Sequence, residues 1–310
     1  MNKPGYTHGR PSIALALALI LSLFGLASCY SPGRSPASMP QQPDQVHWNE
    51  VLQRPPVIRW RILQTGTVHV PLSGMMNLED PKMAGMEDKP IDVLVMAHLL
   101  QRKDGAFLID TGLDDSFSPG HKARMWGPLL RTYVLDWQQN PGQDLGSQLQ
   151  RLQITPEAVF FTHLHSDHTA GVPALSEDTR FYTGKGDTFY NLPFIYRVTH
   201  LDGVQTLQEI DCAHATRVPI LGPVIDIFGD GSLWAICTPG HSAGHLSYLA
   251  ITTDGPVLFT GDASHTRKGF EMGIEPGWVD DREEAIRSLE KLRKFAATYP
   301  QVRVVYGHEL

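Results

Sequence analysis

The sequence is poor in cysteine and has no excess of positive charge. Three cysteines in 310 residues are too few for a disulfide scaffold of the kind that holds small secreted proteins together. Acidic residues outnumber basic ones by 33 to 26, so the formal net charge is -7, which argues against binding nucleic acid or anionic lipid through charge. With 42% hydrophobic and 19% charged residues, the composition is that of a globular protein of one large or two modest domains.

The N-terminus lacks a run long enough to span a membrane but has the features of an export signal over residues 1–28. Lys3 and Arg10 precede an apolar run from Ile13 to Leu21, which is too short for a transmembrane helix. No paired arginine precedes this run, which favours the general secretory route over twin-arginine export. Removing the signal takes away two positive charges and lowers the formal charge from -7 to -9.

The signal ends on Leu26-Ala27-Ser28-Cys29, which resembles the lipobox of bacterial lipoproteins. The resemblance implies cleavage before Cys29 and a lipid such as palmitate on its thiol, so that Cys29 anchors the mature protein to a membrane. Tyr30, rather than Asp, after this cysteine implies the outer membrane if the source is Gram-negative. A plain cleaved signal with an incidental cysteine is the alternative. The sequence leaves open whether the two remaining cysteines, Cys212 and Cys237, pair with each other.

The rest of the chain predicts one folded domain over residues 57–310. Residues 29–56 are rich in Pro and Ser without apolar periodicity, which predicts a tether. Apolar stripes predict two helices. One has Leu145, Leu149 and Leu152 on one face, and the other begins with a capping box at Asp281 and has a stripe of Ile286, Leu289, Leu292 and Phe295. Strands are expected over residues 57–63, 66–71, 91–100, 106–110, 158–161, 224–228, 233–237, 257–260 and 302–306. Strand runs interrupted by helices indicate two sheets covered by helices.

Four potential metal ligands fall within six residues directly after an apolar run. The run from Ala158 to Phe161 predicts a buried strand, and the turn His163-Leu164-His165-Ser166-Asp167-His168 follows it. Because side chains alternate along an extended chain, His163 and His165 point the same way, while Asp167 and His168 can face a neighbouring site. Imidazole and carboxylate ligands without thiolate suit zinc, manganese, iron or cobalt, with zinc as the default. This histidine motif therefore predicts a centre that can hold two metal ions.

Three distant residues share one setting, the end of a strand beside glycine. They are His241 after Gly240, Asp262 after Gly261, and His308 after Gly307. Glycine at a strand end allows backbones to crowd around one point. Each residue alone is a weak signal, and a structural role is the alternative for each. We interpret His245 as structural, and we expect solvated or hydrogen-bonded side chains at the isolated residues His47, His69, His98, His121 and His200.

Together, and in this order after the histidine motif, these residues resemble the metallo-β-lactamase superfamily of two-metal hydrolases over residues 57–310. The resemblance implies an α/β fold of the αββα sandwich type, with the metals at one edge. It further implies that His163, His165 and His241 bind one metal. Asp167, His168 and His308 would bind the second, and Asp262 would bridge the two.

Departures from the pattern separate branches of this superfamily. Zinc β-lactamases lack the bridging Asp, flavo-diiron proteins have Glu at the position of His165, and RNA-processing members carry a basic surface. The stretch from Gly261 to Phe270 and the terminal Tyr306-Gly307-His308 resemble the N-acyl homoserine lactone lactonases. Those lactonases commonly have Tyr three residues after the bridging Asp, where it helps to hold the substrate carbonyl. Here that residue is His265, which can also donate a hydrogen bond but differs in reach.

The chemistry expected of such a centre is hydrolysis of a small carbonyl substrate. Two divalent ions share a water, lower its pKa to give a metal-bridging hydroxide, and polarise the carbonyl. Asp167 is expected to pass a proton to the leaving alkoxide, and His265 to support the carbonyl or the leaving group. The Met-rich loop 73–90 with Trp126, Tyr133 and Trp137 is a candidate acyl pocket.

Several substrates and functions remain open. A lactone like an N-acyl homoserine lactone is the first candidate substrate, and a thioester, a β-lactam or a phosphoester is the alternative within the hydrolases. An iron-dependent sulfur dioxygenase shares the histidine motif. A non-catalytic lipoprotein that keeps the fold for binding is the alternative from another class.

Overall fold

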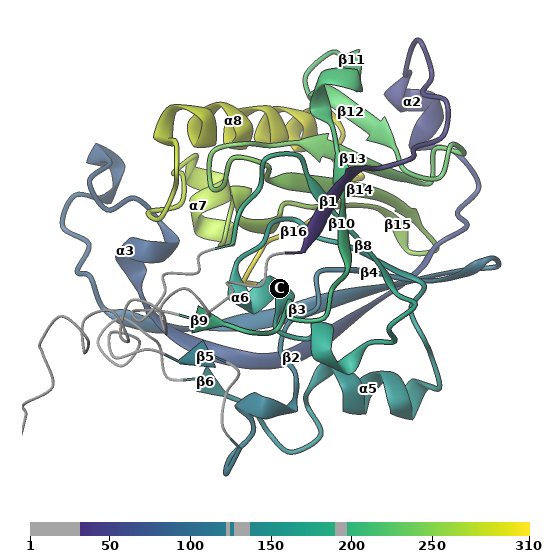
Figure 1. Ribbon diagram of the computed structural model, residues 1–310. Helices are drawn as coiled ribbons and strands as arrows, with labels where there is room; N and C mark the ends of the chain where they lie inside the picture. The colour runs from purple at the N-terminus through teal and green to yellow at the C-terminus, as the bar shows by residue number, and fades with distance from the viewer. Residues whose placement is uncertain (1–31, 122–124, 127–136, 190–196) are drawn as a thin grey trace, which may run out of the picture. The chain divides into compact units, whose positions relative to one another are not determined.

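The computed structural model describes residues 32–121, 125–126, 137–189 and 197–310 (Figure 1). Eight strands form one sheet, here sheet A, in the order β1-β10-β8-β7-β4-β3-β2-β6, and six form sheet B, in the order β11-β12-β13-β14-β15-β16. The short strands β5 (Met125–Trp126) and β9 (Arg197–Val198) pair with each other. The α/β fold with two mixed sheets that the sequence predicts is confirmed.

Sheet A brings the ends of several parallel strands to one edge. It contains β1 (Gly33–Pro36), β2 (Arg59–Pro71), β3 (Pro90–Arg102), β4 (Gly105–Ile109), β6 (Trp137–Gln138), β7 (Ala158–Phe160), β8 (Arg180–Gly184) and β10 (Thr206–Ile210). The strands from β1 through β10, β8 and β7 to β4 are parallel, whereas the pairs from β4 to β6 are antiparallel. The segments after β4, β7 and β8 therefore leave the sheet at the same edge.

Sheet B delivers three more strand ends. It contains β11 (Thr216–Val218), β12 (Gly222–Asp226), β13 (Leu233–Cys237), β14 (Leu246–Thr252), β15 (Gly255–Phe259) and β16 (Arg303–Val305). Its strands are antiparallel from β11 to β15, and β16 is parallel to β15. Two reversals between β13 and β15 return the chain to its first direction, so β13, β15 and β16 run the same way.

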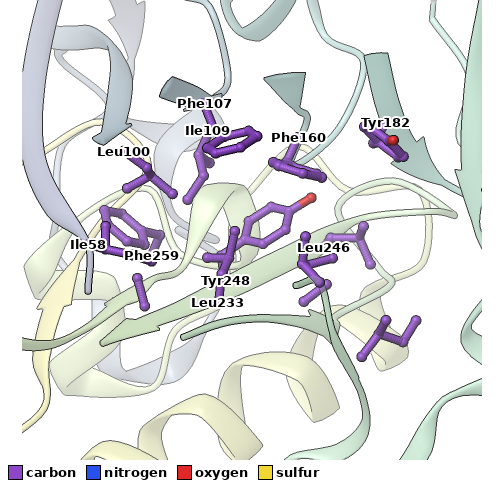
Figure 2. Packing of buried hydrophobic residues seen from close by; sticks show 14 of the residues in the cluster. Ile58, Leu100, Phe107, Ile109, Phe160, Tyr182, Leu233, Leu246, Tyr248 and Phe259 are labelled. Atoms are coloured by element: carbon purple, nitrogen blue, oxygen red, sulfur yellow. The ribbon is translucent and has the colours of Figure 1, made fainter. Parts of the chain in front are cut away.

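Large apolar side chains fill the space between the two sheets (Figure 2). Phe107 and Ile109 of β4 and Phe160 of β7 belong to the same buried cluster as Tyr248 of β14 and Phe259 of β15. Because side chains alternate along a strand, the neighbouring residues point to the opposite face of sheet A. This inter-sheet layer holds the strand ends of both sheets in fixed positions.

Helices cover the outer faces of both sheets. Leu145 and Leu149 of α5 (Leu145–Leu152) pack with Leu108 and Val159 on the outer face of sheet A. Helix α8 (Arg282–Thr298) covers the outer face of sheet B, and Asp281 caps its start by accepting a hydrogen bond from the main-chain nitrogen of Glu284. The layers follow the expected αββα order. No helix within the described ranges combines the length and apolar character needed to cross a membrane.

The predicted tether is wrong for the part of residues 29–56 that the structure describes. Strand β1 pairs in parallel with β10, and the main-chain nitrogen of Gly33 donates to the carbonyl of Gln205 at 3.0 Å. Helix α2 (Trp48–Val51) buries Trp48 against Trp234, with ring centroids 5.4 Å apart. Proline is tolerated in β1 because this is an edge strand, so the Pro-rich composition does not prevent sheet pairing.

Two further elements differ from the sequence prediction. Residues 57–71 were expected to form two strands with a turn, but β2 is one strand whose register with β3 shifts between Gln64 and Gly66, a bulge rather than a turn. In α8 the predicted apolar stripe is buried at Leu289 and Leu292, whereas Ile286 is 38% exposed.

Cys212 and Cys237 form a disulfide, a pairing that the sequence leaves open. Cys212 lies in the short helix η4 (Cys212–His214) beyond β10 of sheet A, and Cys237 is the last residue of β13 in sheet B. The bond therefore ties the two sheets together four residues before His241.

Candidate metal centre

The histidine motif lies where β7 reaches the shared edge and continues into α6 (Ser166–Thr169). Asp110, directly after β4, holds the turn because its carboxylate accepts hydrogen bonds from the main-chain nitrogen and the hydroxyl of Thr162, at 2.7 and 2.8 Å. Asp187 accepts another from the main-chain nitrogen of Leu164 at 2.8 Å. His163 and His168 are consequently buried, with 0% and 4% exposure.

The structure brings the three distant candidates to this turn. His241 follows β13, Asp262 lies in η5 (Gly261–Ala263) after β15, and His308 follows β16. Possible ligand atoms lie within 4.8 Å of one another in each of two groups, one of His163, His165, His241 and Asp262, the other of Asp167, His168 and His308. Asp262 Oδ2 is also 3.4 Å from Nε2 of both His168 and His308, so it lies between the two groups.

The crowding expected at the glycines is present. A Cβ atom at Gly307 would lie 2.3 Å from Asp262 Oδ1. Gly240 has a φ of 131°, and a Cβ there would lie 2.1 Å from the main-chain nitrogen of Ala285 in α8. Only glycine allows these strand ends to approach so closely.

Nitrogen atoms of the first group face one another without a hydrogen between them. Nδ1 of His241 donates to the carbonyl of Trp278 at 2.8 Å, and Nδ1 of His163 donates to the Thr162 hydroxyl at 3.0 Å. Their Nε2 atoms, 3.2 Å apart, therefore carry lone pairs when the rings are neutral. Burial lowers the pKa of His163 and of His241 well below the ordinary value, so both rings are neutral at pH 7. A cation between these atoms would remove the repulsion.

The histidines of the second group also donate outwards through Nδ1. His168 donates through Nδ1 to Asp110 at 2.8 Å, and His308 donates through Nδ1 to the carbonyl of Leu94 at 2.7 Å. Among the described residues, the buried His168 Nε2 and Asp262 Oδ1 have no hydrogen-bond partner. Metal-binding histidines usually donate their outer nitrogen to a carboxylate or a carbonyl in this way. The residues therefore fit divalent cations at both groups.

The other two candidate ligands, His165 and Asp167, are only partly buried. His165 places Nδ1 at 3.0 Å from Nε2 of His241. The side chain of Asp167 is 19% exposed and that of Asp262 is 4% exposed. Asp167 is therefore the carboxylate of the centre that a substrate can reach.

Two more histidines adjoin the centre in opposite orientations. His245 accepts a hydrogen bond through Nε2 from the main-chain nitrogen of Asp262 at 3.0 Å, and its Nδ1 lies 2.8 Å from the Thr238 hydroxyl. Burial lowers the pKa of His245 to about 3, so it is neutral and supports the backbone, in agreement with a structural role. His265 instead points Nε2 at Asp262 Oδ2, 3.0 Å away, and forms a third possible ligand group with Asp262 and His308.

The sequence reasoning assigned no role to Asp110, Asp187 or the carbonyl of Trp278. Asp110 adopts a φ of 55°, which is uncommon for a residue other than glycine and aims its carboxylate at Thr162 and His168. Its signal in the sequence was Asp110-Thr111-Gly112 at the end of a strand that is parallel to β7. Nothing comparable marks Asp187 or Trp278.

The candidate acyl pocket is described only in part. Tyr133 lies outside the described residues, and only the main chain of Trp126 lies within them. Trp137 packs against Phe117, with ring centroids 5.1 Å apart. Segment 73–90 is not all loop, because it includes the end of α3 (Leu72–Met75) and η1 (Pro81–Met83). Of its methionines, Met75, Met76 and Met83 are buried in apolar clusters and Met86 is 42% exposed.

The sequence matches the Metallo-beta-lactamase superfamily over residues 90–308. The N-acyl homoserine lactonase AttM of Agrobacterium fabrum is 28% identical over 268 residues, which are 81% of this chain and 93% of that protein. An N-acyl homoserine lactonase of a Bacillus species is 29% identical over 230 residues, which are 71% of this chain and 83% of that protein.

Solved structures of lactone hydrolases have the same fold. A quorum-quenching N-acyl homoserine lactone hydrolase aligns with a TM-score of 0.62 and 20% identity, covering 83% of this chain and 94% of that one. Another, with N-hexanoyl-L-homoserine bound at its catalytic metal center, aligns with a TM-score of 0.61 and 22% identity, covering 83% and 95%. The family match covers most of the chain and agrees with the fold and the clustered residues, so the chain belongs to the metallo-β-lactamase superfamily.

Proposed function

We propose that this hydrolase is a dinuclear metal enzyme that opens a lactone ring of the N-acyl homoserine lactone kind. The observation that carries the proposal is the convergence of buried lone pairs from β7, β13, β15 and β16 on one point. The choice of a lactone as substrate is supported by the relatives named N-acyl homoserine lactonases. The chain covers 93% of the Agrobacterium protein and 83% of the Bacillus protein.

The distances between possible ligand atoms support two cation sites. His163, His165 and His241 would hold one ion, and Asp167, His168 and His308 would hold the other. Asp262 would bridge them. Zinc suits this set of imidazoles and carboxylates, and manganese, iron or cobalt are the alternatives.

When bound, the two ions would provide a nucleophile at neutral pH by lowering the pKa of water, and would polarise the substrate carbonyl. The chain would contribute proton transfer through Asp167, which belongs to the second group and whose carboxylate is partly exposed. This carboxylate would take up the proton released on attack and deliver it to the leaving alkoxide. Asp110, Trp278 and Leu94 would fix the ring orientations of the ligand histidines through their Nδ1 atoms.

The substrate is tested with the purified chain loaded with zinc, manganese or cobalt. Opening of N-hexanoyl homoserine lactone releases a proton, which a pH indicator measures, and a thioester, nitrocefin and bis-p-nitrophenyl phosphate complete the panel. We expect the highest kcat/KM for the lactone, complete loss of turnover in chelator and recovery when metal returns.

His69→Gln is the matched control variant, because His69 is an exposed histidine whose side chain pairs with Asp92. It should behave like the unchanged protein throughout the panel. If another substrate is cleaved well and the lactone stays closed, the lactone is the wrong substrate class. Oxygen uptake with a persulfide substrate in the iron-loaded protein would instead indicate the sulfur dioxygenase.

We also propose that the protein is exported and held on a membrane by a lipid on Cys29. The disulfide between Cys212 and Cys237 supports export, because such bonds persist in oxidising compartments. Labelled palmitate should enter the full-length protein and not the Cys29→Ser variant. Unchanged processing and membrane attachment in that variant would contradict the proposal.

A further inference from the structure

The hydrogen on His265 can be placed from its neighbours. Nδ1 of His265 lies 3.1 Å from the main-chain carbonyl oxygen of Met75. A carbonyl oxygen only accepts, so Nδ1 carries the hydrogen and donates it. In the neutral ring Nε2 then carries a lone pair, and this atom lies 3.0 Å from Asp262 Oδ2. A lone pair and a carboxylate oxygen at this distance repel each other unless a cation lies beside both.

His265 shares this arrangement with two histidines of the proposed metal sites. His241 and His308 each donate through Nδ1 to a main-chain carbonyl and each place Nε2 3.4 Å from Asp262 Oδ2. The His265 ring lies close to both, with centroid distances of 5.2 Å to His241 and 5.3 Å to His308. His245 shows the opposite orientation, because its Nε2 accepts a hydrogen bond from the backbone.

We propose that His265 is an eighth metal ligand, which binds a cation through Nε2 together with Asp262 and His308. The proposal rests on the dinuclear centre described above. The three residues are buried, and their ligand atoms lie within 4.8 Å of one another. The resemblance to lactonases does not predict this ligand, because those enzymes commonly have Tyr at this position.

Two other roles for His265 fit the contacts less well. Support of a substrate carbonyl needs a hydrogen on the nitrogen that faces the centre, whereas the hydrogen of the neutral ring points at Met75. An imidazolium paired with Asp262 would place a third buried positive charge beside two divalent ions, and like charges at such distances repel strongly in a poorly solvated interior. A bond from Nε2 of His265 to a cation needs no hydrogen on this nitrogen and adds no further positive charge.

Metal binding by His265 would affect which substrates the centre can hold. A nitrogen bound to a cation donates no hydrogen bond, so His265 would not replace the Tyr that helps lactonases to hold the substrate carbonyl. It would also occupy a coordination position. The centre would therefore hold its second cation more tightly, with one position fewer for substrate.

Proton NMR of the cobalt-loaded full chain tests the proposal directly. Each imidazole bound to cobalt gives one strongly shifted N–H resonance that disappears in D₂O. We expect one such resonance more than the five histidines of the two proposed sets provide. The His265→Tyr variant should lose one resonance and bind its second cobalt at least about tenfold more weakly, the lower end of the losses seen when the surroundings of a metal site are disrupted.

Two controls make the outcome decisive. His308→Gln should also lose a resonance, and His69→Gln should lose none. If His265→Tyr fails to fold, the resonance count of the unchanged protein and the His265→Gln variant give the same answer. An unchanged count and unchanged cobalt affinity in the His265 variants would overturn the proposal, even if turnover falls. Two bound cobalt ions without lactone turnover would count against the proposed substrate and leave this ligand assignment standing.

Discussion

At the scale of single residues, the orientation of each imidazole separates the proposed metal ligands from His245, which supports the backbone. His241, His308 and His168 donate outwards through Nδ1, which turns Nε2 towards Asp262 or the space beside it. His245 keeps its Nε2 for the main-chain nitrogen of Asp262. Sequence spacing contains no information on this difference, because it depends on which carbonyls and hydroxyls surround each ring.

His245→Ala should therefore act mainly on stability. The change leaves the main-chain nitrogen of Asp262 and the Thr238 hydroxyl without this partner, which costs about 1–3 kcal/mol of unfolding free energy for a buried polar group. Chemical denaturation of the metal-free protein measures this cost. Metal content should remain close to that of the unchanged chain, and a variant of normal stability that binds no metal would show that His245 is itself a ligand.

The pH dependence of metal binding follows from His168 and His308. Burial lowers the pKa of both rings, but attraction to several carboxylates together outweighs it. Asp262 and Asp167 raise the pKa of His308, and these two with Asp110 raise the pKa of His168 well above its ordinary value. In the metal-free protein both rings thus hold their second proton up to a higher pH than a free imidazole, and a cation must displace this proton. Proton release on binding makes the apparent affinity rise with pH.

Titration calorimetry with zinc in buffers of different ionisation enthalpy measures this proton release. Affinity should be weaker at pH 6 than at pH 8. Binding that releases no protons, with equal affinity at both pH values, would contradict the assignment of these rings as ligands.

At the scale of elements, apolar patterning predicted eight of the sixteen described strands and both long helices. It was less accurate where residues of one helix differ in their exposure to solvent. Ile286 has helical spacing with Leu289 and Leu292 but lies at the rim of the α8 interface, where solvent reaches it. Strand β14 was missed although all of its residues are buried. Strand β1 was missed because its pairing with β10 depends on a partner 173 positions later in the sequence, from Gly33 to Thr206.

The contrast within α8 predicts unequal effects of two substitutions. Leu292 is fully buried against sheet B, so Leu292→Ala should lower the free energy of unfolding by about 2–5 kcal/mol. Ile286→Ala, at an exposed position of the same helix, should change it by less than about 1 kcal/mol. Urea denaturation compares the two variants, and equal losses would show that α8 does not pack as described.

At the scale of the whole molecule, both sheets deliver strand ends to one edge, so the residues of the proposed metal centre come together only when the two sheets pack against each other. The sequence identified seven of the clustered residues from their setting after strands and from a family resemblance. It did not identify Asp110 or Asp187 as the residues that hold the turn, because their contacts arise from the pairing of β4, β7 and β8.

The disulfide between Cys212 and Cys237 is a covalent link between sheet A and sheet B. Replacing both Cys212 and Cys237 by alanine should lower the free energy of unfolding by about 3 kcal/mol, the loss expected for a bond across 25 residues. Reductant should have a similar effect on the unchanged protein and none on the double variant. Equal unfolding curves of the oxidised protein and the double variant would show that the inter-sheet core holds the junction without the bond.

The proposed two-metal centre depends on Asp262 as the bridge between the ions. Elemental analysis of the purified chain and its Asp262→Ala variant, with lactone turnover measured on the same samples, tests it most directly. We expect two divalent ions per chain in the unchanged protein, and loss of one or both together with nearly all turnover in the variant. Little metal in the unchanged protein, with a stability that chelator does not alter, would show that these residues do not form a metal centre.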